Sequence, residues 1–124
     1  MAQRSIALCL LVSIVVPDVA FAQSGANGIS GGGTLTDRSG TIASANTSQQ
    51  VFAINTSRAY CEIQAIGTAD LWIAIGHVAA ANTPGSYWLP AGSLFRCPNP
   101  PPLGAINALS AAAGAAFSAY EWAR

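Results

Sequence analysis

The sequence predicts an all-β protein, a small antiparallel β-sandwich or jelly-roll-like barrel of about seven or eight short strands. Three observations predict this class. β-Branched and aromatic residues recur in short runs, turn residues separate the runs about every eight to twelve positions, and several runs alternate apolar and polar residues with a period of two. The chain has 124 residues, which is enough for one domain.

Residues 1–22 have the features of a cleavable secretory signal peptide. Arg4 supplies a positive charge, residues 6–16 form a nearly uninterrupted apolar run, and small residues at the end place the cleavage site after Ala22. The apolar run is about half as long as the roughly twenty residues of a membrane-spanning helix. We therefore expect a secreted or periplasmic protein without stable membrane insertion; the alternative is a buried N-terminal helix.

Two regions follow the signal peptide. Residues 23–33 are rich in Gly, Ser and Asn and have little apolar surface, so they are predicted to form a flexible leader. Residues 34–124 then form the predicted β-sandwich domain, in which the β-branched and aromatic runs begin.

Five segments of this domain are predicted as strands, in chain order residues 49–54, 58–66, 71–75, 86–89 and 93–97. The second and third show the clearest alternation of apolar and polar positions. The fourth and fifth are separated by a Pro-Ala-Gly hinge. A proline-rich stretch comes next and is expected to be an extended surface connector, because proline donates no backbone hydrogen bond to a sheet.

The last segment, residues 104–124, is ambiguous. Residues 105–113 have good helix propensity, but Gly114 interrupts them and the following residues alternate as in a strand. We predict two closing strands joined near Gly114. The alternative is a C-terminal helix, which would make the fold α+β.

Two cysteines remain after the predicted cleavage, Cys61 and Cys97, and export places them where disulfides persist. We predict that they pair. The bond would close a loop of about 36 residues, which loop-closure entropy values at roughly 3 to 4 kcal/mol of stability. The alternative is two buried free thiols.

The charge balance excludes one class of partner. The predicted mature chain has four arginines, no lysine and four carboxylates, so its net charge is zero. Nucleic-acid binding would need clustered basic residues, and the sequence has no such cluster. With so few charges the chain has little electrostatic repulsion between copies, which favours self-association or docking on a larger assembly.

No catalytic or metal-binding pattern is present. His77 is the only histidine and is expected in a turn or on the surface, without the neighbours that a catalytic triad requires. Zinc needs three or four ligands, and one histidine, two cysteines predicted to be bonded and four scattered carboxylates are too thin a supply. The carboxylates are interpreted as solvated charges: Asp37, Glu62, Asp70 and Glu121. We therefore predict no enzyme activity and no cofactor; a cofactor-free glycosidase is the remaining enzymatic alternative.

Aromatic residues are the best candidates for a binding surface, because they supply a large contact area at low entropic cost. The candidates are Trp72, Tyr87, Trp88, Tyr120 and Trp122. They could stack on sugars or hold a partner protein. Trp88 is equally well explained as a core residue, whereas Trp72 is expected to be exposed, since it lies opposite the apolar face of its strand.

Several short motifs resemble small β-sandwich accessory proteins of bacteriophage and prophage virions, of the head-decoration or fibre type. These motifs are residues 34–42, Arg58-Ala59-Tyr60, Leu71-Trp72-Ile73, Leu89-Pro90-Ala91-Gly92 and residues 116–122. The resemblance implies a virion-associated structural role. The signal peptide and the cysteine pair depart from it, because phage capsids assemble in the cytoplasm.

Together these observations predict a non-enzymatic exported module that self-assembles or docks on a larger protein assembly. The alternative is a carbohydrate-binding module whose exposed aromatic residues bind polysaccharide.

Overall fold

The computed structural model of this chain describes residues 32–124. The predicted signal peptide and residues 23–31 of the predicted leader lie outside the described residues. The described residues form β-strands and no helix, so the predicted all-β class is confirmed. The tail forms two strands with a turn at Gly114, as predicted, and the alternative of a C-terminal helix is wrong.

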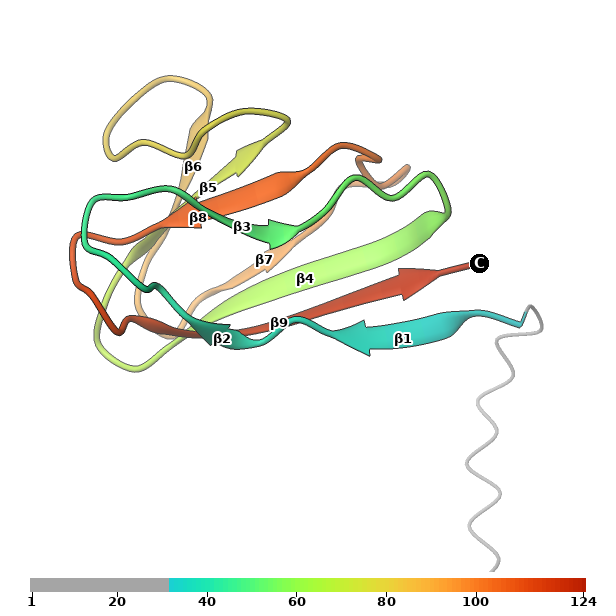
Figure 1. The fold of residues 1–124 in the computed structure, drawn as a ribbon, viewed down its shortest axis with the longest axis horizontal. Helices are drawn as coiled ribbons and strands as arrows, with labels where there is room; N and C mark the ends of the chain where they lie inside the picture. Colours follow the sequence, from blue (N-terminus) through green and yellow to red (C-terminus); the bar gives the residue numbers. More distant parts are fainter. Residues whose placement is uncertain (1–31) are drawn as a thin grey trace, which may run out of the picture.

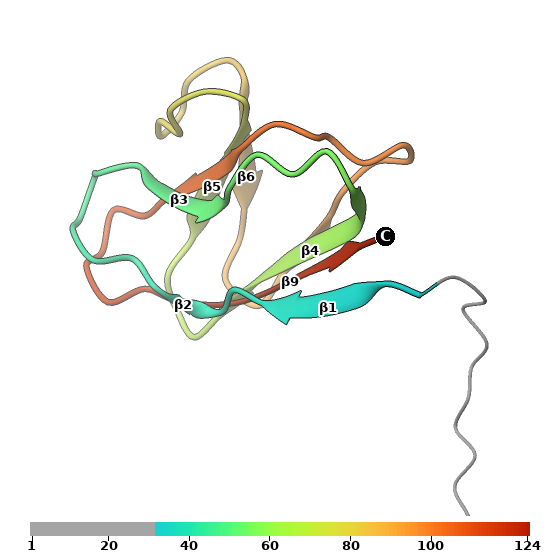
Figure 2. The same cartoon turned by 45° about the vertical axis from the view of Figure 1, so that its right-hand side comes forward.

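Nine short strands build two antiparallel sheets packed face to face (Figure 1). Figure 2 shows the same two layers from a second direction. The strands are β1 (Thr34–Asp37), β2 (Gly40–Thr41), β3 (Gln49–Phe52), β4 (Arg58–Ile66), β5 (Leu71–Ile75), β6 (Ser86–Leu89), β7 (Leu94–Arg96), β8 (Ile106–Leu109) and β9 (Ala116–Ala123).

The five-stranded sheet has the order β1-β9-β4-β7, with β2 also paired to β9, and the four-stranded sheet has the order β3-β8-β5-β6. β1 and β2 lie end to end along β9 and act as one interrupted strand. Counted in this way, the eight strands form two four-stranded sheets with the strand order of a jelly roll, the second form that the sequence predicted.

The predicted hinge between the fourth and fifth strand segments is a crossing from one sheet to the other. β6 is an edge strand of the four-stranded sheet and β7 an edge strand of the five-stranded sheet. Between them Gly92 has a φ of 77°, a conformation that favours glycine. The rings of Tyr87 and Phe95 lie 5.5 Å apart and join the two edge strands.

The core lies between the sheets. Its largest fully buried side chains are Phe52, Ile42, Ile63, Leu71, Ile73 and Ile106. β4 shows why the sequence pattern succeeded: Cys61, Ile63 and Ala65 are buried while Gln64 and Ile66 between and after them are exposed. The predicted Cys61–Cys97 disulfide is confirmed, with 5.3 Å between the two Cα atoms, and it ties β4 to the end of β7.

A loop covers the outer face of the four-stranded sheet. Residues 76–85 fold back over β5 and β8, where Ala79 packs on Ala74 and Leu109 in a second small core. Polar side chains hold the loop in place. The hydroxyl of Ser48 accepts from the Ala79 amide at 2.9 Å, and the side-chain amide of Asn107 donates to the His77 carbonyl at 2.6 Å. We call this surface the covered face.

Candidate functional site

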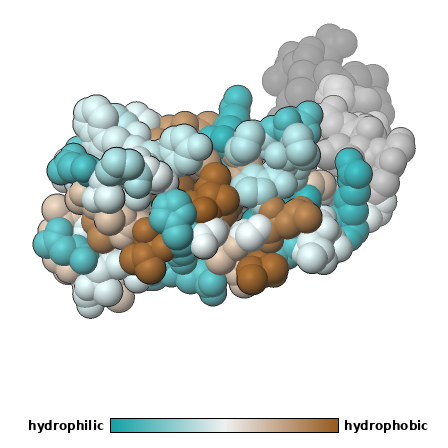
Figure 3. Space-filling model, turned by 90° about the horizontal axis from the view of Figure 1, so that it is seen from above, coloured by the Kyte–Doolittle hydropathy of each residue, from teal (hydrophilic) through white to brown (hydrophobic). Residues whose placement is uncertain are grey.

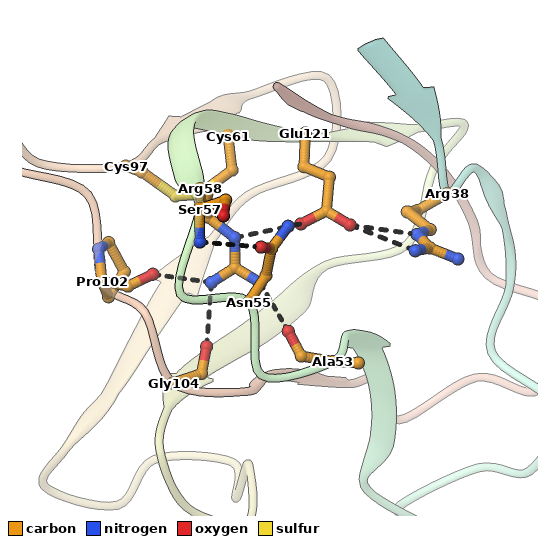
Figure 4. Close-up of polar contacts among 10 residues, drawn as sticks. All are labelled: Arg38, Ala53, Asn55, Ser57, Arg58, Cys61, Cys97, Pro102, Gly104 and Glu121. Atoms are coloured by element: carbon orange, nitrogen blue, oxygen red, sulfur yellow. Dashed lines mark hydrogen bonds and ion pairs between the residues drawn. A yellow bond between two sulfur atoms is a disulfide. The ribbon is translucent and has the colours of Figure 1, made fainter. Parts of the chain in front are cut away.

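A polar cluster around Arg58 and Glu121 lies at one end of the sandwich and is buried except for Arg38 (Figure 4). Arg58 begins β4 and Glu121 lies on the inner side of β9, with 3.1 Å between Nε and Oε2. Arg38 binds the other carboxylate oxygen at 3.2 Å, and the Asn55 amide donates to Oε2 at 3.4 Å. Glu121 is only 2% exposed, so its interpretation as a solvated charge was wrong.

The Arg58 guanidinium holds three chain segments together. It donates to the carbonyl oxygens of Ala53, Pro102 and Gly104 at 2.6 to 2.8 Å and lies 5.4 Å from the centre of the Phe52 ring. Its side chain is fully buried, so the Arg58 donors are out of reach of a substrate; only Arg38, at 45% side-chain exposure, faces solvent. We conclude that the cluster stabilises the fold.

The pKa of the Glu121 carboxyl reflects this environment. Burial alone would raise the pKa, but hydrogen bonds from Arg58, Asn55 and Arg38 outweigh burial and lower it from its ordinary value of 4.5. The carboxylate is therefore ionised at neutral pH. A buried ion pair of this kind is stabilising only because its remaining hydrogen-bonding groups are also satisfied.

The other carboxylates lie in separate hydrogen-bonded settings. Asp37 accepts from the Ser39 amide at 2.8 Å, Glu62 from the Tyr60 hydroxyl at 2.6 Å, and Asp70 from the Ala91 amide at 2.9 Å. Within residues 32–124, no group of three or more His, Cys, Asp or Glu side chains is placed to hold a metal ion. His77 is exposed in the loop over the covered face, with Nδ1 2.9 Å from the Ile75 carbonyl oxygen.

The five aromatic candidates do not form one surface. Trp72 and Trp88 are cross-strand partners on the covered face. Tyr87 points the other way and contacts Phe95 at the sandwich edge. The remaining two, Tyr120 and Trp122, lie on the outer face of the five-stranded sheet.

The two tryptophans on the covered face differ in exposure: for Trp88 the sequence allows either core or surface, and for Trp72 it predicts the surface. Trp88 is 62% exposed, so it is not a core residue. Trp72 was expected to be exposed but is only partly so, because it packs against the small core of Ala74, Ala79 and Leu109.

On the outer face of the five-stranded sheet, side chains from three neighbouring strands line up in one row. Leu35 of β1, Trp122 of β9 and Tyr60 of β4 form one row, in which Leu35 is 56% and Tyr60 40% exposed. Ile66 and Leu94, farther along the same face, are also exposed. No loop comparable to residues 76–85 is tied over these residues in the described chain, and we call this surface the open face.

A second row on the open face carries charge. It runs across the sheet from Asp37 on β1 through Tyr120 and Glu62 to Arg96 on β7. Asp37 at one edge of the sheet and Arg96 at the other are both exposed. Glu62 lies 3.9 Å from Arg96, and its hydrogen bond from Tyr60 raises the pKa of that hydroxyl.

The sequence analysis missed four residues of the open face: Leu35, Tyr60, Ile66 and Leu94. A signal was available for two of them. Tyr60 and Ile66 lie on the side of β4 that the alternation assigned to solvent, where apolar residues are unexpected. Leu35 and Leu94 could not be found in this way, because β1 and β7 are too short to show a period.

No protein-family model, curated protein or solved structure matches this chain. The described residues also contain no helix with the length and apolar character needed to cross a membrane. Function must therefore be argued from the two faces themselves.

Proposed function

We propose that this protein is an exported, non-enzymatic structural module that assembles with protein through its open face, in the first place with a second copy of itself. The observation that carries the proposal is the combination on this face of an exposed apolar row and a row with opposite charges at its two edges.

The apolar row favours a protein partner. Leu35 and Tyr60 in this row, and Ile66 and Leu94 farther along the same face, are each at least 40% exposed. Clustered exposed apolar residues are typical of interaction sites, and aromatic residues are enriched at the centres of protein interfaces. Figure 3, the view from above over the four-stranded sheet, shows apolar residues there only in separate islands among paler and hydrophilic ones.

The charged row is complementary to itself. Consider a two-fold axis that runs parallel to the strands, midway between β9 and β4. It places β1 of one copy over β7 of the other, and β9 over β4, because the sheet order is β1-β9-β4-β7. Asp37 then faces Arg96 of the second copy, and Tyr120 faces Glu62. The two-fold symmetry forms the Asp37–Arg96 ion pair twice.

Two further features support an assembly role. Only 8% of all residues in the chain are charged and the net charge is zero, so two copies repel each other little. The jelly-roll order is also used by viral capsid domains, which fits the resemblance of the sequence to virion accessory modules. That support is an analogy of fold, and lectin domains use the same order.

The test is light scattering after size-exclusion chromatography of the oxidised protein over a wide concentration range. We expect a defined oligomer that dissociates on dilution. Leu35→Ser should weaken association roughly thirtyfold, because a two-fold dimer loses the burial of the exposed half of two leucines, about 1 kcal/mol each.

Val78→Ser is the matched control. Val78 is 71% exposed but lies in the loop over the covered face, so its replacement should leave association unchanged. A monomer at every concentration, or equal losses in the two variants, would contradict self-assembly through the open face.

A further inference from the structure

Trp88 is an exposed tryptophan with a fixed orientation. It projects from the edge strand β6 on the covered face and is 62% exposed. Its indole Nε1 donates to Oδ2 of Asp70 at 3.1 Å. Asp70 is itself held by the Ala91 amide, which donates to Oδ1 at 2.9 Å. The ring is therefore presented to solvent in one orientation, which lowers the entropic cost of binding a ligand against it.

A shallow groove of about 390 Å³ lies beside this tryptophan. Its lining consists of Thr68, Ala69, Asp70, Trp72, Ser110, Ala111 and Ala112. Trp72 is the cross-strand partner of Trp88, and Asp70 contributes to the groove while it holds the Trp88 indole. Ser110 is fixed by the hydrogen bond that its hydroxyl donates to the Asp70 carbonyl at 2.7 Å. Trp72 and Asp70 thus connect the groove to Trp88, which does not itself line the groove.

The chemistry of this site fits a sugar. A pyranose ring has an apolar face of C–H groups and a rim of hydroxyls, and the site has a flat aromatic ring beside hydrogen-bonding groups. Each carboxylate oxygen of Asp70 uses one acceptor position for the protein and keeps a second one. We propose that Trp88, Trp72 and Asp70 form a binding site for a neutral oligosaccharide, with Trp88 as the stacking platform and Asp70 as a hydroxyl acceptor.

The charge of the site argues for a neutral ligand. No Arg lines the groove, so nothing there attracts a sulfate, phosphate or uronate. The single negative charge, on Asp70, already receives two N–H donors. The open shape of the groove suits an oligosaccharide that continues past the site.

This site is independent of the proposed assembly. The open face belongs to the five-stranded sheet and the sugar site to the four-stranded sheet. Leu35→Ser should therefore weaken self-association and leave sugar binding unchanged. A failure of either proposal does not decide the other.

The experiment is isothermal titration of the oxidised protein with three neutral hexasaccharides of different linkage, namely cellohexaose, chitohexaose and maltohexaose. We expect at least one of them to bind. Trp88→Ala should weaken binding at least about tenfold, the usual effect of removing an aromatic anchor. Because Trp88 is mostly exposed, the variant should keep its fold; if it does not, Trp88→Leu replaces the ring by an apolar side chain and tests the same point.

Trp122→Phe is the control, since it alters a tryptophan on the other sheet. Intrinsic fluorescence adds a second readout, because the chain has three tryptophans. The response to sugar should persist in Trp122→Phe and be lost in Trp88→Ala. Three results would each overturn the proposal: no binding of any hexasaccharide at millimolar concentration, unchanged affinity in both Trp88 variants, or a fluorescence response to tetramethylammonium alone, which would indicate a site for cations.

Discussion

The two sheets of this jelly roll differ in whether a loop covers their outer face. On the four-stranded sheet, the loop of residues 76–85 folds back and buries Ala74 and Leu109 beneath Ala79. On the five-stranded sheet, the equivalent side leaves Leu35 and Tyr60 exposed beside a row of charged side chains.

This difference supports the proposal of a partner for the open face, although Val78 and Trp88 stay exposed on the covered face. The same chain covers one outer face with a loop of small residues, held by Ser48 and Asn107. A face that the chain leaves uncovered, and that carries matched charges at its two edges, is better explained by a partner. The following predictions separate the two faces experimentally, from the largest expected effect to the smallest.

Reduction of the disulfide should have the largest effect. Cys61 and Cys97 are 36 residues apart and fasten β4 to the edge strand β7, which carries Leu94 and Arg96 on the open face. Loss of the bond should lower the free energy of unfolding by about 3 to 4 kcal/mol. Urea unfolding with and without reductant measures this loss. An unchanged unfolding midpoint would contradict the structural role of the bond.

Truncation of an apolar residue should distinguish the faces directly. Leu109 is 5% exposed in the small core of the covered face, so Leu109→Ala should destabilise the monomer by about 3 kcal/mol. Leu35→Ser on the open face should change monomer stability by less than about 0.5 kcal/mol, although it weakens association. Urea unfolding at a protein concentration below the dissociation constant of the oligomer gives the stability change of the monomer for both variants. Equal losses would mean that the faces do not differ as described.

The loss of stability at acid pH should be smaller than the losses in the two preceding predictions, and it should come from the buried Glu121. The pKa of Glu121 is lower in the folded protein than its ordinary value of 4.5. The stabilisation is therefore complete at neutral pH and is lost as the pH falls below about 4.5 toward the lower folded-state pKa. Thermal unfolding should show a plateau from pH 7 to about 5 and a decline below it. In Glu121→Gln the protein should be less stable at pH 7 and the decline should be shallower; an identical pH profile would contradict this assignment.

Local patterns in the sequence were enough to predict the longer strands, because burial alternates clearly along β4 and β9. The short strands β1 and β2 were not among the predicted segments. In β4, Cys61 and Ile63 face the core and Gln64 faces solvent, as the period of two requires. The closing strands were also predicted, since Gly114 interrupts a segment that would otherwise suit a helix; it adopts a φ of 75° in the turn.

The arrangement of the strands could not be predicted in this way, because pairing joins residues far apart in the chain. Glu121 is buried because Arg58, 63 positions earlier, lies against it. Trp88 is fixed in solvent because Asp70 receives its indole N–H. The aromatic candidates separated onto different faces because β6 and β9 belong to different sheets, which no local pattern reveals.

The measurement that most directly tests the central claim is a charge-reversal cycle at the open face, followed by sedimentation equilibrium. Asp37→Arg and Arg96→Asp should each weaken self-association by about fivefold, because each places like charges opposite each other twice in a two-fold dimer. The double variant restores both pairs and should return to within about twofold of the original affinity. If the two losses simply added in the double variant, Asp37 would not face Arg96 of a second copy, and the proposed assembly would be contradicted.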